Sequence, residues 1–125
     1  MSSLRIEHVN LSVSDADRAA ELMQSIFGWQ IRWQGIGRDD GRVIHVGTSD
    51  HYLALYTTIA GTGPLNFKKG QPLNHVGVEV DDLEATERRV IEAGFVPFAH
   101  GDYEPGRRFY FFDGDGIEFE VISYG

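Results

Sequence analysis

The chain contains two copies of one short pattern, and this internal repeat restricts the folds that it can adopt. The first copy reads His-Val-Asn-Leu-Ser-Val-Ser-Asp over 8–15, and the second reads His-Val-Gly-Val-Glu-Val-Asp-Asp over 75–82. Apolar and polar residues alternate in both copies, as in a strand with one buried face. The copies are offset by 67 positions in a chain of 125 residues, so each repeat unit accounts for about half of the protein.

Each copy runs into a segment with the helical spacing of apolar residues. Asp15 is a predicted N-cap and Gly28 a predicted C-terminal stop, and in the second half Asp81 or Asp82 caps a helix that ends at Gly94. Both helices are expected to run for about thirteen residues. The strands that follow are predicted at 29–34, 42–47 and 52–57, and at 95–100, 107–112 and 117–123.

The pattern is therefore βαβββ twice, an α+β fold with module one at 4–60, a linker at 61–72 and module two at 73–124, all within a single domain at 1–125. With the helices on the outer face, the two half-sheets are expected to form a curved mixed sheet around a cavity for a metal and a substrate. The polar faces of the first strands would point His8 and His75 into that cavity.

A third polar residue, Glu120, lies on the polar face of the last strand, because it alternates with Phe119 and Val121. A histidine or glutamate on one strand alone is more often structural or solvated. Histidines at both equivalent positions, with a glutamate placed to converge on them, favour a metal site. Two imidazoles and a carboxylate suit Fe²⁺ or Mn²⁺, with Zn²⁺ or Ni²⁺ as alternatives.

Composition excludes several other classes of protein. Nineteen acidic residues against eleven basic ones give a net charge of −8, which argues against a nucleic-acid partner. The absence of cysteine excludes disulfides, thiolate nucleophiles and cysteine-ligated metals. No stretch approaches the ~20 apolar residues of a membrane span, and the N-terminus has no apolar signal segment, so a cytoplasmic protein is expected. Hydrolase-elbow, zincin and Walker motifs are missing too.

The repeat, together with Phe-Tyr-Phe-Phe-Asp-Gly-Asp-Gly-Ile-Glu-Phe-Glu at 109–120, resembles the vicinal oxygen chelate superfamily over essentially the whole chain. That group includes glyoxalase I, extradiol dioxygenases, fosfomycin-resistance thiol transferases and bleomycin-resistance proteins. The resemblance implies that His8, His75 and Glu120 hold a divalent metal, and that the protein acts on a small oxygen-bearing substrate. It implies a substrate contact for Tyr110 as a catalytic residue, although Tyr110 could equally be a strand aromatic that packs the cavity wall.

The sequence departs from the family pattern at three places, one of which is Leu22-Met23 in the first helix, where Phe-Tyr is common. Gly114 replaces the usual proline of the last turn, and Ala54 stands where glyoxalase I has a fourth ligand, which argues against that activity. The remaining ligand set is closer to the dioxygenases and fosfomycin transferases, while a lyase or isomerase reaction stays open. Asn10 shares the face of His8 and is a candidate substrate-binding residue. Arg108 could attract an anionic substrate, or it could simply be a charged residue beside a turn.

The roles of three further histidines stay open: His45, His51 and His100. An alternative function is that of a metal-free protein of the bleomycin-resistance kind, which would bind a small molecule or drug in an acidic, aromatic-lined groove. A domain that serves only structure or regulation is a third. The resemblance also implies a homodimer, in which swapped modules could place His8 of one chain beside His75 and Glu120 of the other.

Overall fold

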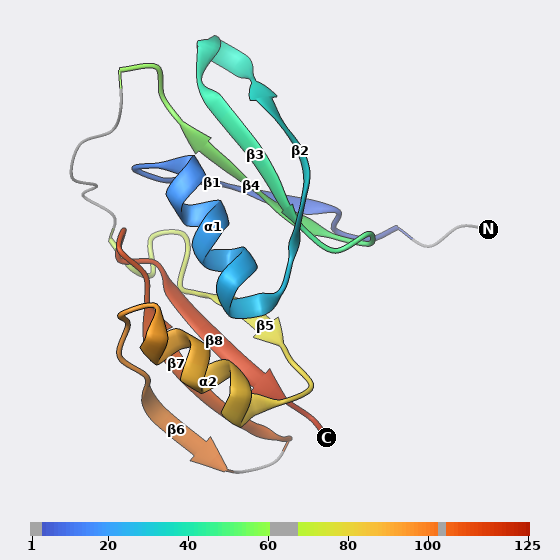
Figure 1. The fold of residues 1–125 in the computed structure, drawn as a ribbon, viewed down its shortest axis with the longest axis vertical. Helices are drawn as coiled ribbons and strands as arrows, with labels where there is room; N and C mark the ends of the chain where they lie inside the picture. Colours follow the sequence, from blue (N-terminus) through green and yellow to red (C-terminus); the bar gives the residue numbers. More distant parts are fainter. Residues whose placement is uncertain (1–3, 61–67, 103–104) are drawn as a thin grey trace. The chain divides into compact units, whose positions relative to one another are not determined.

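The computed structural model describes residues 4–60, 68–102 and 105–125, and the chain divides into two compact units, Met1–Leu65 and Asn66–Gly125 (Figure 1). The boundary falls inside the predicted linker 61–72, of which 61–67 lie outside the described residues. The description of the chain as a single domain and the cavity between its modules stay predictions.

The first unit follows the predicted βαβββ order. It contains β1 (His8–Ser12), α1 (Ala16–Phe27), β2 (Gln30–Ile36), a 3-10 turn (Arg38–Asp40), β3 (Arg42–Gly47) and β4 (Tyr52–Thr57). The strands form one mixed sheet in the order β1-β4-β3-β2, in which β1 pairs in parallel with β4 and the other pairs are antiparallel.

The second unit repeats this plan with β5 (Val76–Glu79), α2 (Leu83–Glu92), β6 (Phe98–Asp102), β7 (Arg107–Phe112) and β8 (Glu118–Ser123). Its sheet has the equivalent order β5-β8-β7-β6, again with one parallel pair, β5 with β8. The predicted α+β fold with two βαβββ modules is therefore confirmed, as two four-stranded mixed sheets.

The helix ends are set by the residues that the sequence indicates. The Asp15 carboxylate accepts the Arg18 N–H at 3.1 Å, and Gly28 ends α1 with φ of 71°. Asp82, rather than Asp81, caps α2 by accepting the Ala85 N–H at 3.0 Å. With 12 and 10 residues, both helices are shorter than the thirteen expected.

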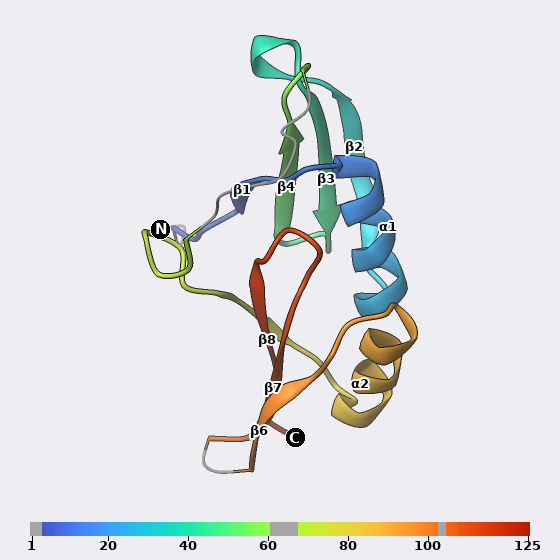
Figure 2. The same ribbon diagram turned by 90° about the vertical axis from the view of Figure 1, so that its left-hand side faces the viewer.

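Each helix lies along one side of the sheet of its own unit (Figures 1 and 2). Alternate strand residues beneath the helices are buried: Ile44, Val46 and Leu55 in the first unit, and Phe109, Phe119 and Val121 in the second. Full burial of an apolar side chain of this size contributes roughly 1.5–3 kcal/mol. The opposite face of each sheet carries the polar residues of the predicted site together with apolar ones such as Val43 and Ile122.

Two expectations need correction. The strand predicted at 95–100 is β6 at Phe98–Asp102, because Pro97 has no N–H for a ladder and the backbone turns to φ of 54° at Ala99, where the β6–β7 register breaks. Val9 was expected on a covered apolar face, yet 45% of it is exposed, since β1 is an edge strand.

Candidate metal centre

The strand registers place the predicted site residues on the faces turned away from the helices. In the first unit, His8 lies opposite Tyr52, and Asn10 opposite Ala54, across the parallel β1–β4 pair. In the second unit, Glu120 is paired with Gly77 on one side and with Tyr110 on the other. Asn10 and Gly77 are equivalent in the repeat, so Ala54 stands at the position equivalent to Glu120.

The second unit brings three of the predicted residues together around Glu120. His75 Nε2 lies 3.0 Å from Glu120 Oε1. Arg108 Nη1 donates to Glu120 Oε2 at 3.0 Å, and the Tyr110 hydroxyl donates to the same oxygen at 3.3 Å. The side chains of Glu120 and Arg108 are only 14% and 11% exposed, so this ion pair is largely shielded from water. The two carboxylate oxygens of Glu120 thus have different partners: Oε2 accepts from Arg108 and Tyr110, and Oε1 faces the His75 imidazole.

The other nitrogen of His75 is also engaged. Its Nδ1 lies 2.7 Å from Asn74 Oδ1, and Lys69 Nζ donates to that same oxygen at 2.8 Å. Lys69 Nζ also lies 3.1 Å from Oε1 of Glu118, which is a buried carboxylate on the same face as Glu120. An ammonium group has only donors, so it identifies the Asn74 atom as the carbonyl oxygen, and His75 Nδ1 must therefore carry a proton.

This arrangement can be tested for its fit to a metal ion. With the proton on Nδ1, a neutral His75 presents a lone pair at Nε2 to the carboxylate Oε1, which also only accepts. Their 3.0 Å contact requires a second imidazole proton or a cation shared by both atoms. Two ligands about 2.1 Å from one ion and at right angles to each other would lie about 3.0 Å apart. The pair fits two ligands of one divalent ion.

In the first unit, His8 has equivalent surroundings on a sheet of the same plan. Its Nδ1 lies 2.9 Å from Glu7 Oε1, so this carboxylate accepts the Nδ1 proton and the lone pair of the neutral ring is on Nε2. The hydrogen bond from His8 lowers the pKa of Glu7. The Tyr52 ring stacks on His8 at a centroid distance of 4.9 Å, and its hydroxyl donates to Glu7 Oε1 at 3.3 Å.

Further rings extend this face beyond His8. His45 stacks on Tyr52 at 4.5 Å, Trp33 lies 5.1 Å from His45, and the Arg32 guanidinium sits 4.2 Å from the centre of the Tyr52 ring. Burial lowers the pKa of His45, and the neighbouring His8 and Arg32 add to this effect. Burial also raises the pKa of Tyr52, with the Glu7 charge adding to the effect.

Other predicted residues lie outside these clusters. Asn10 is exposed on β1, on the same face as His8. His51 is exposed in the turn between β3 and β4, where its carbonyl accepts the Thr48 N–H. His100 Nε2 bonds an oxygen of Glu87 at 2.8 Å on a different surface of the second unit. Sequence reasoning missed Glu7 and Asn74, although a polar residue before each histidine was visible in the repeat.

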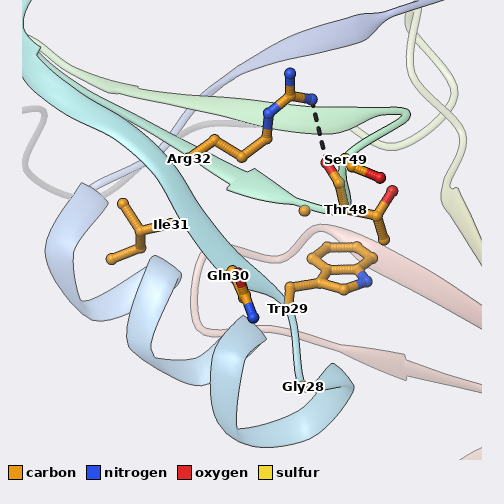
Figure 3. A pocket seen from close by; sticks show the side chains of 8 residues that line it. Gly28, Trp29, Gln30, Ile31, Arg32, Thr48 and Ser49 are labelled. Atoms are coloured by element: carbon orange, nitrogen blue, oxygen red, sulfur yellow. Dashed lines mark hydrogen bonds between the residues drawn. The ribbon is translucent and has the colours of Figure 1, made fainter.

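A hollow of about 530 Å³ lies in the first unit, where α1 ends and β2 begins (Figure 3). Eight residues line it: Gly28, Trp29, Gln30, Ile31, Arg32, Gly47, Thr48 and Ser49. Arg32 Nη1 donates to the Thr48 carbonyl oxygen at 3.2 Å (Figure 3). None of the predicted site residues lines this hollow, so the clusters above, and not the hollow, are the candidate site.

Neither unit holds a complete set of three metal ligands among its described residues. Within 4–60, 68–102 and 105–125, no three histidine, aspartate or glutamate side chains gather closely enough to hold a metal ion. Of the three predicted ligands, the second unit brings together His75 and Glu120, and His8 belongs to the first unit. In the same part of the chain, no helix has the length and apolar character needed to cross a membrane.

Comparison with known families identifies the class of this protein. The model of the Glyoxalase/Bleomycin resistance protein/Dioxygenase superfamily matches residues 5–121. The chain belongs to this superfamily, as its repeat and its C-terminal motif predict. A comparison with curated protein sequences found no match.

Solved structures share the fold at low sequence identity. A glyoxylase/bleomycin resistance protein/dioxygenase domain from Frankia sp. EAN1pec is 24% identical with a TM-score of 0.84, over 99% of this chain and 100% of that one. TnmS3, an antibiotic binding protein from Streptomyces sp. CB03234, is 19% identical with a TM-score of 0.74, over 100% and 99%. A mutant of the fosfomycin resistance protein FosX from Listeria monocytogenes, complexed with Mn(II) and a dihydroxypropylphosphonic acid, is 17% identical with a TM-score of 0.73, over 98% and 90%.

Proposed function

We propose that the protein is a divalent-metal-dependent enzyme of the vicinal oxygen chelate type, in which His8, His75 and Glu120 hold the ion. The observation that carries the proposal is the contact of His75 Nε2 with Glu120 Oε1 at 3.0 Å, with the remaining polar atoms of both side chains engaged elsewhere. The repeat supplies His8 from the equivalent strand, with Nδ1 held in the same way. Family membership supports the same conclusion.

Two imidazoles and one carboxylate suit Fe²⁺ or Mn²⁺ best, with Zn²⁺ or Ni²⁺ as alternatives. Such an ion would act as a Lewis acid on a small substrate that presents two neighbouring oxygens. The FosX mutant that shares the fold is described as complexed with Mn(II). We propose a reaction of the dioxygenase or fosfomycin-transferase kind ahead of a glyoxalase-like lyase or isomerase, because Ala54 supplies no fourth ligand.

The other site residues act by binding and orienting. Arg108 and Tyr110 hold Glu120 Oε2, which turns Oε1 toward His75. The Tyr110 hydroxyl can instead donate to a substrate oxygen, and this is the contact that we assign to it as a catalytic residue. Arg108 would attract an anionic substrate group, and the Asn10 amide, on the face of His8, would bind a polar group of the substrate.

A second candidate function is that of a metal-free protein that binds a small molecule or drug. The observation that favours it is the chain of rings from His8 through Tyr52 and His45 to Trp33, a surface on which a planar ligand could stack. TnmS3, which shares the fold, is described as an antibiotic binding protein.

We further propose a cytoplasmic homodimer, formed with or without swapped modules, that has a small-molecule substrate and no nucleic-acid partner. The net charge of −8 supports the absence of a nucleic-acid partner. Light scattering behind size exclusion tests the assembly, since a mass near the 14.0 kDa of one chain would contradict it.

The metal proposal is tested by elemental analysis of protein purified without chelators, before and after soaking with each of the four ions. The parent is expected to hold one ion per site, and Glu120→Gln to lose it while its circular dichroism is unchanged. Glu87→Gln is the matched control, because it changes a histidine-bound carboxylate outside the site and should keep the metal. A parent that binds none of the four ions would leave the binding-protein function in first place.

A further inference from the structure

We infer that each proposed metal-binding histidine is oriented by a tether of the same design: the residue before the histidine accepts its Nδ1 proton, and another side chain fixes that acceptor. The inference rests on the proposed function in one respect, namely that Nε2 of each histidine is the metal-binding atom. Glu7, Tyr52, Lys69 and Asn74 would then be positioning residues, and none of them is a ligand in the proposal.

In the first unit the acceptor is a carboxylate. Glu7 Oε1 lies 2.9 Å from His8 Nδ1, and the Tyr52 hydroxyl donates to the same oxygen at 3.3 Å. The register of β1 and β4 places Tyr52 directly opposite His8, and the two rings stack at 12° to each other. Tyr52 thus touches both members of the pair, one with its hydroxyl and the other with its ring.

In the second unit the acceptor is an amide. Asn74 Oδ1 lies 2.7 Å from His75 Nδ1, and Lys69 Nζ fixes that oxygen at 2.8 Å. Glu118, which is only 7% exposed, holds Lys69 through a 3.1 Å ion pair. Its Oε1 is also 3.9 Å from His75 Nδ1, too far for a hydrogen bond. Glu118 therefore acts on His75 through Lys69 and Asn74.

The chemical consequence is a fixed tautomer. A histidine whose Nδ1 proton is held by an oxygen acceptor presents Nε2 as a lone pair, and such a partner orients the ring and raises its basicity toward a metal. The two tethers differ in charge, because Glu7 is a carboxylate and Asn74 a neutral amide. His8 should therefore be the more strongly donating imidazole of the two.

His100 is an internal control for the tautomers of His8 and His75, because it is bonded through the other ring nitrogen. His100 is bonded through Nε2 to a Glu87 oxygen at 2.8 Å, so its neutral form should carry the proton on Nε2. Long-range ¹H–¹⁵N spectra of the metal-free full chain should show a proton on Nδ1 of His8 and of His75, whether or not His75 Nε2 is also protonated toward the Glu120 carboxylate, and should show neutral His100 protonated on Nε2. Neutral His8 and His75 with a bare Nδ1 would overturn the inference.

Substitutions then connect the tether to metal binding, measured by titration with Mn²⁺ and Zn²⁺. Asn74→Leu and Glu7→Leu should each release the tautomer and weaken metal affinity by roughly 10–100-fold. Asn74→Asp, which keeps the acceptor, should restore both properties, and Glu87→Leu should leave metal affinity within about twofold of the parent. If Asn74→Leu and Glu7→Leu leave the tautomers unchanged, the tether is wrong, whatever the metal affinity.

The two proposals fail in different measurements. The spectra of metal-free protein decide the tether, because they require no bound ion. The metal content of the parent decides the proposed function, because it does not depend on the tautomer. Lys69→Met gives an independent check, since it should loosen the tautomer of His75 but not that of His8.

Discussion

The open faces of the two sheets have the same backbone plan, but different side chains lie beside the histidine of each. In the first unit the face is built from stacked rings, with Tyr52 and His45 beside His8. In the second unit the carboxylates of Glu118 and Glu120 lie beside His75, and rings such as Tyr110 and Phe98 lie farther along the same face. The strand registers make Tyr52 equivalent to Glu118, Ala54 to Glu120 and His45 to Tyr110. Only the histidine is the same in both sites.

This difference shows that the repeat fixes positions but not interactions. A duplicated βαβββ unit has equivalent positions on each open face, and different types of residue occupy those positions in the two halves. Under the proposed function, the second half would contribute a carboxylate ligand beside its imidazole, whereas the first half would contribute an imidazole and a surface for a planar group. Four comparisons between variants would break or sharpen this contrast.

The largest effect is expected from Glu120→Ala. This change leaves the Arg108 guanidinium, 11% exposed, without its carboxylate, and breaking a shielded ion pair in this way costs about 3–5 kcal/mol. Urea denaturation of the metal-free protein measures the free energy of unfolding. A loss below about 1 kcal/mol would mean that the second face does not depend on its charges. The double variant Arg108→Met, Glu120→Leu should recover much of the loss.

A smaller loss is expected from Tyr52→Leu in the first unit. The change removes the stacking on His8 and His45 and the contact with Arg32, and we expect a cost of about 1–3 kcal/mol in the same measurement. Tyr52→Phe is the control, because it keeps the ring and removes only the hydroxyl. If Tyr52→Phe cost as much as Tyr52→Leu, the face would depend on hydrogen bonding rather than on stacking.

The turns before β4 and β8 give a third comparison, in which stability depends on pH. Asp113 Oδ1 accepts the N–H groups of Asp115 and Ile117, both at 2.9 Å, and burial raises the Asp113 pKa. The folded protein therefore binds this proton more tightly than the unfolded chain. The contribution of Asp113 to stability falls as the pH rises from the ordinary carboxyl range through the raised pKa.

Asp113→Asn keeps the acceptor oxygen and removes the charge. Measured against this variant from pH 3 upward, the parent should lose relative stability as the pH rises. A constant difference would show that the carboxyl titrates alike in both states. At the equivalent turn, Thr48 Oγ1 accepts the N–H groups of Asp50 and His51 at 3.3 and 3.4 Å. Thr48→Val should show no such dependence, because a hydroxyl does not titrate in this range.

The smallest effect is expected where the two units agree. Arg42 bonds Asp17 in the first unit and Arg107 bonds Glu84 in the second, and both pairs link the third strand of a unit to its helix. The Arg107 hydrogen bond lowers the pKa of Glu84. Exposed ion pairs contribute little, so Asp17→Asn and Glu84→Gln should leave the thermal midpoint unchanged at physiological salt. A clear shift from either variant would reveal a stronger helix–sheet link.

The sequence predicts the fold well because its strongest signals are local. Caps such as Asp15 and Asp82 act within one turn of helix, and the alternation that sets Glu120 on the open face extends over a few residues. The displaced start of β6 is a local error too, since Pro97 was visible in the sequence. The contact of Lys69 with Asn74 and Glu118 was not predictable in this way, because it joins a residue of the predicted linker to a site on the last strand.

The order of the strands has a consequence for how the protein forms during synthesis. The hairpins β2–β3 and β3–β4 close over short loops, but β1 pairs with β4 across a sequence separation of 44 positions, from His8 to Tyr52. Contacts between distant residues form late, because the entropy of closing the long loop must be overcome first. The strand that bears His8 leaves the ribosome first and must wait for residue 57 before it can pair. β5 repeats the delay, so both histidines reach their places only when each unit is otherwise complete.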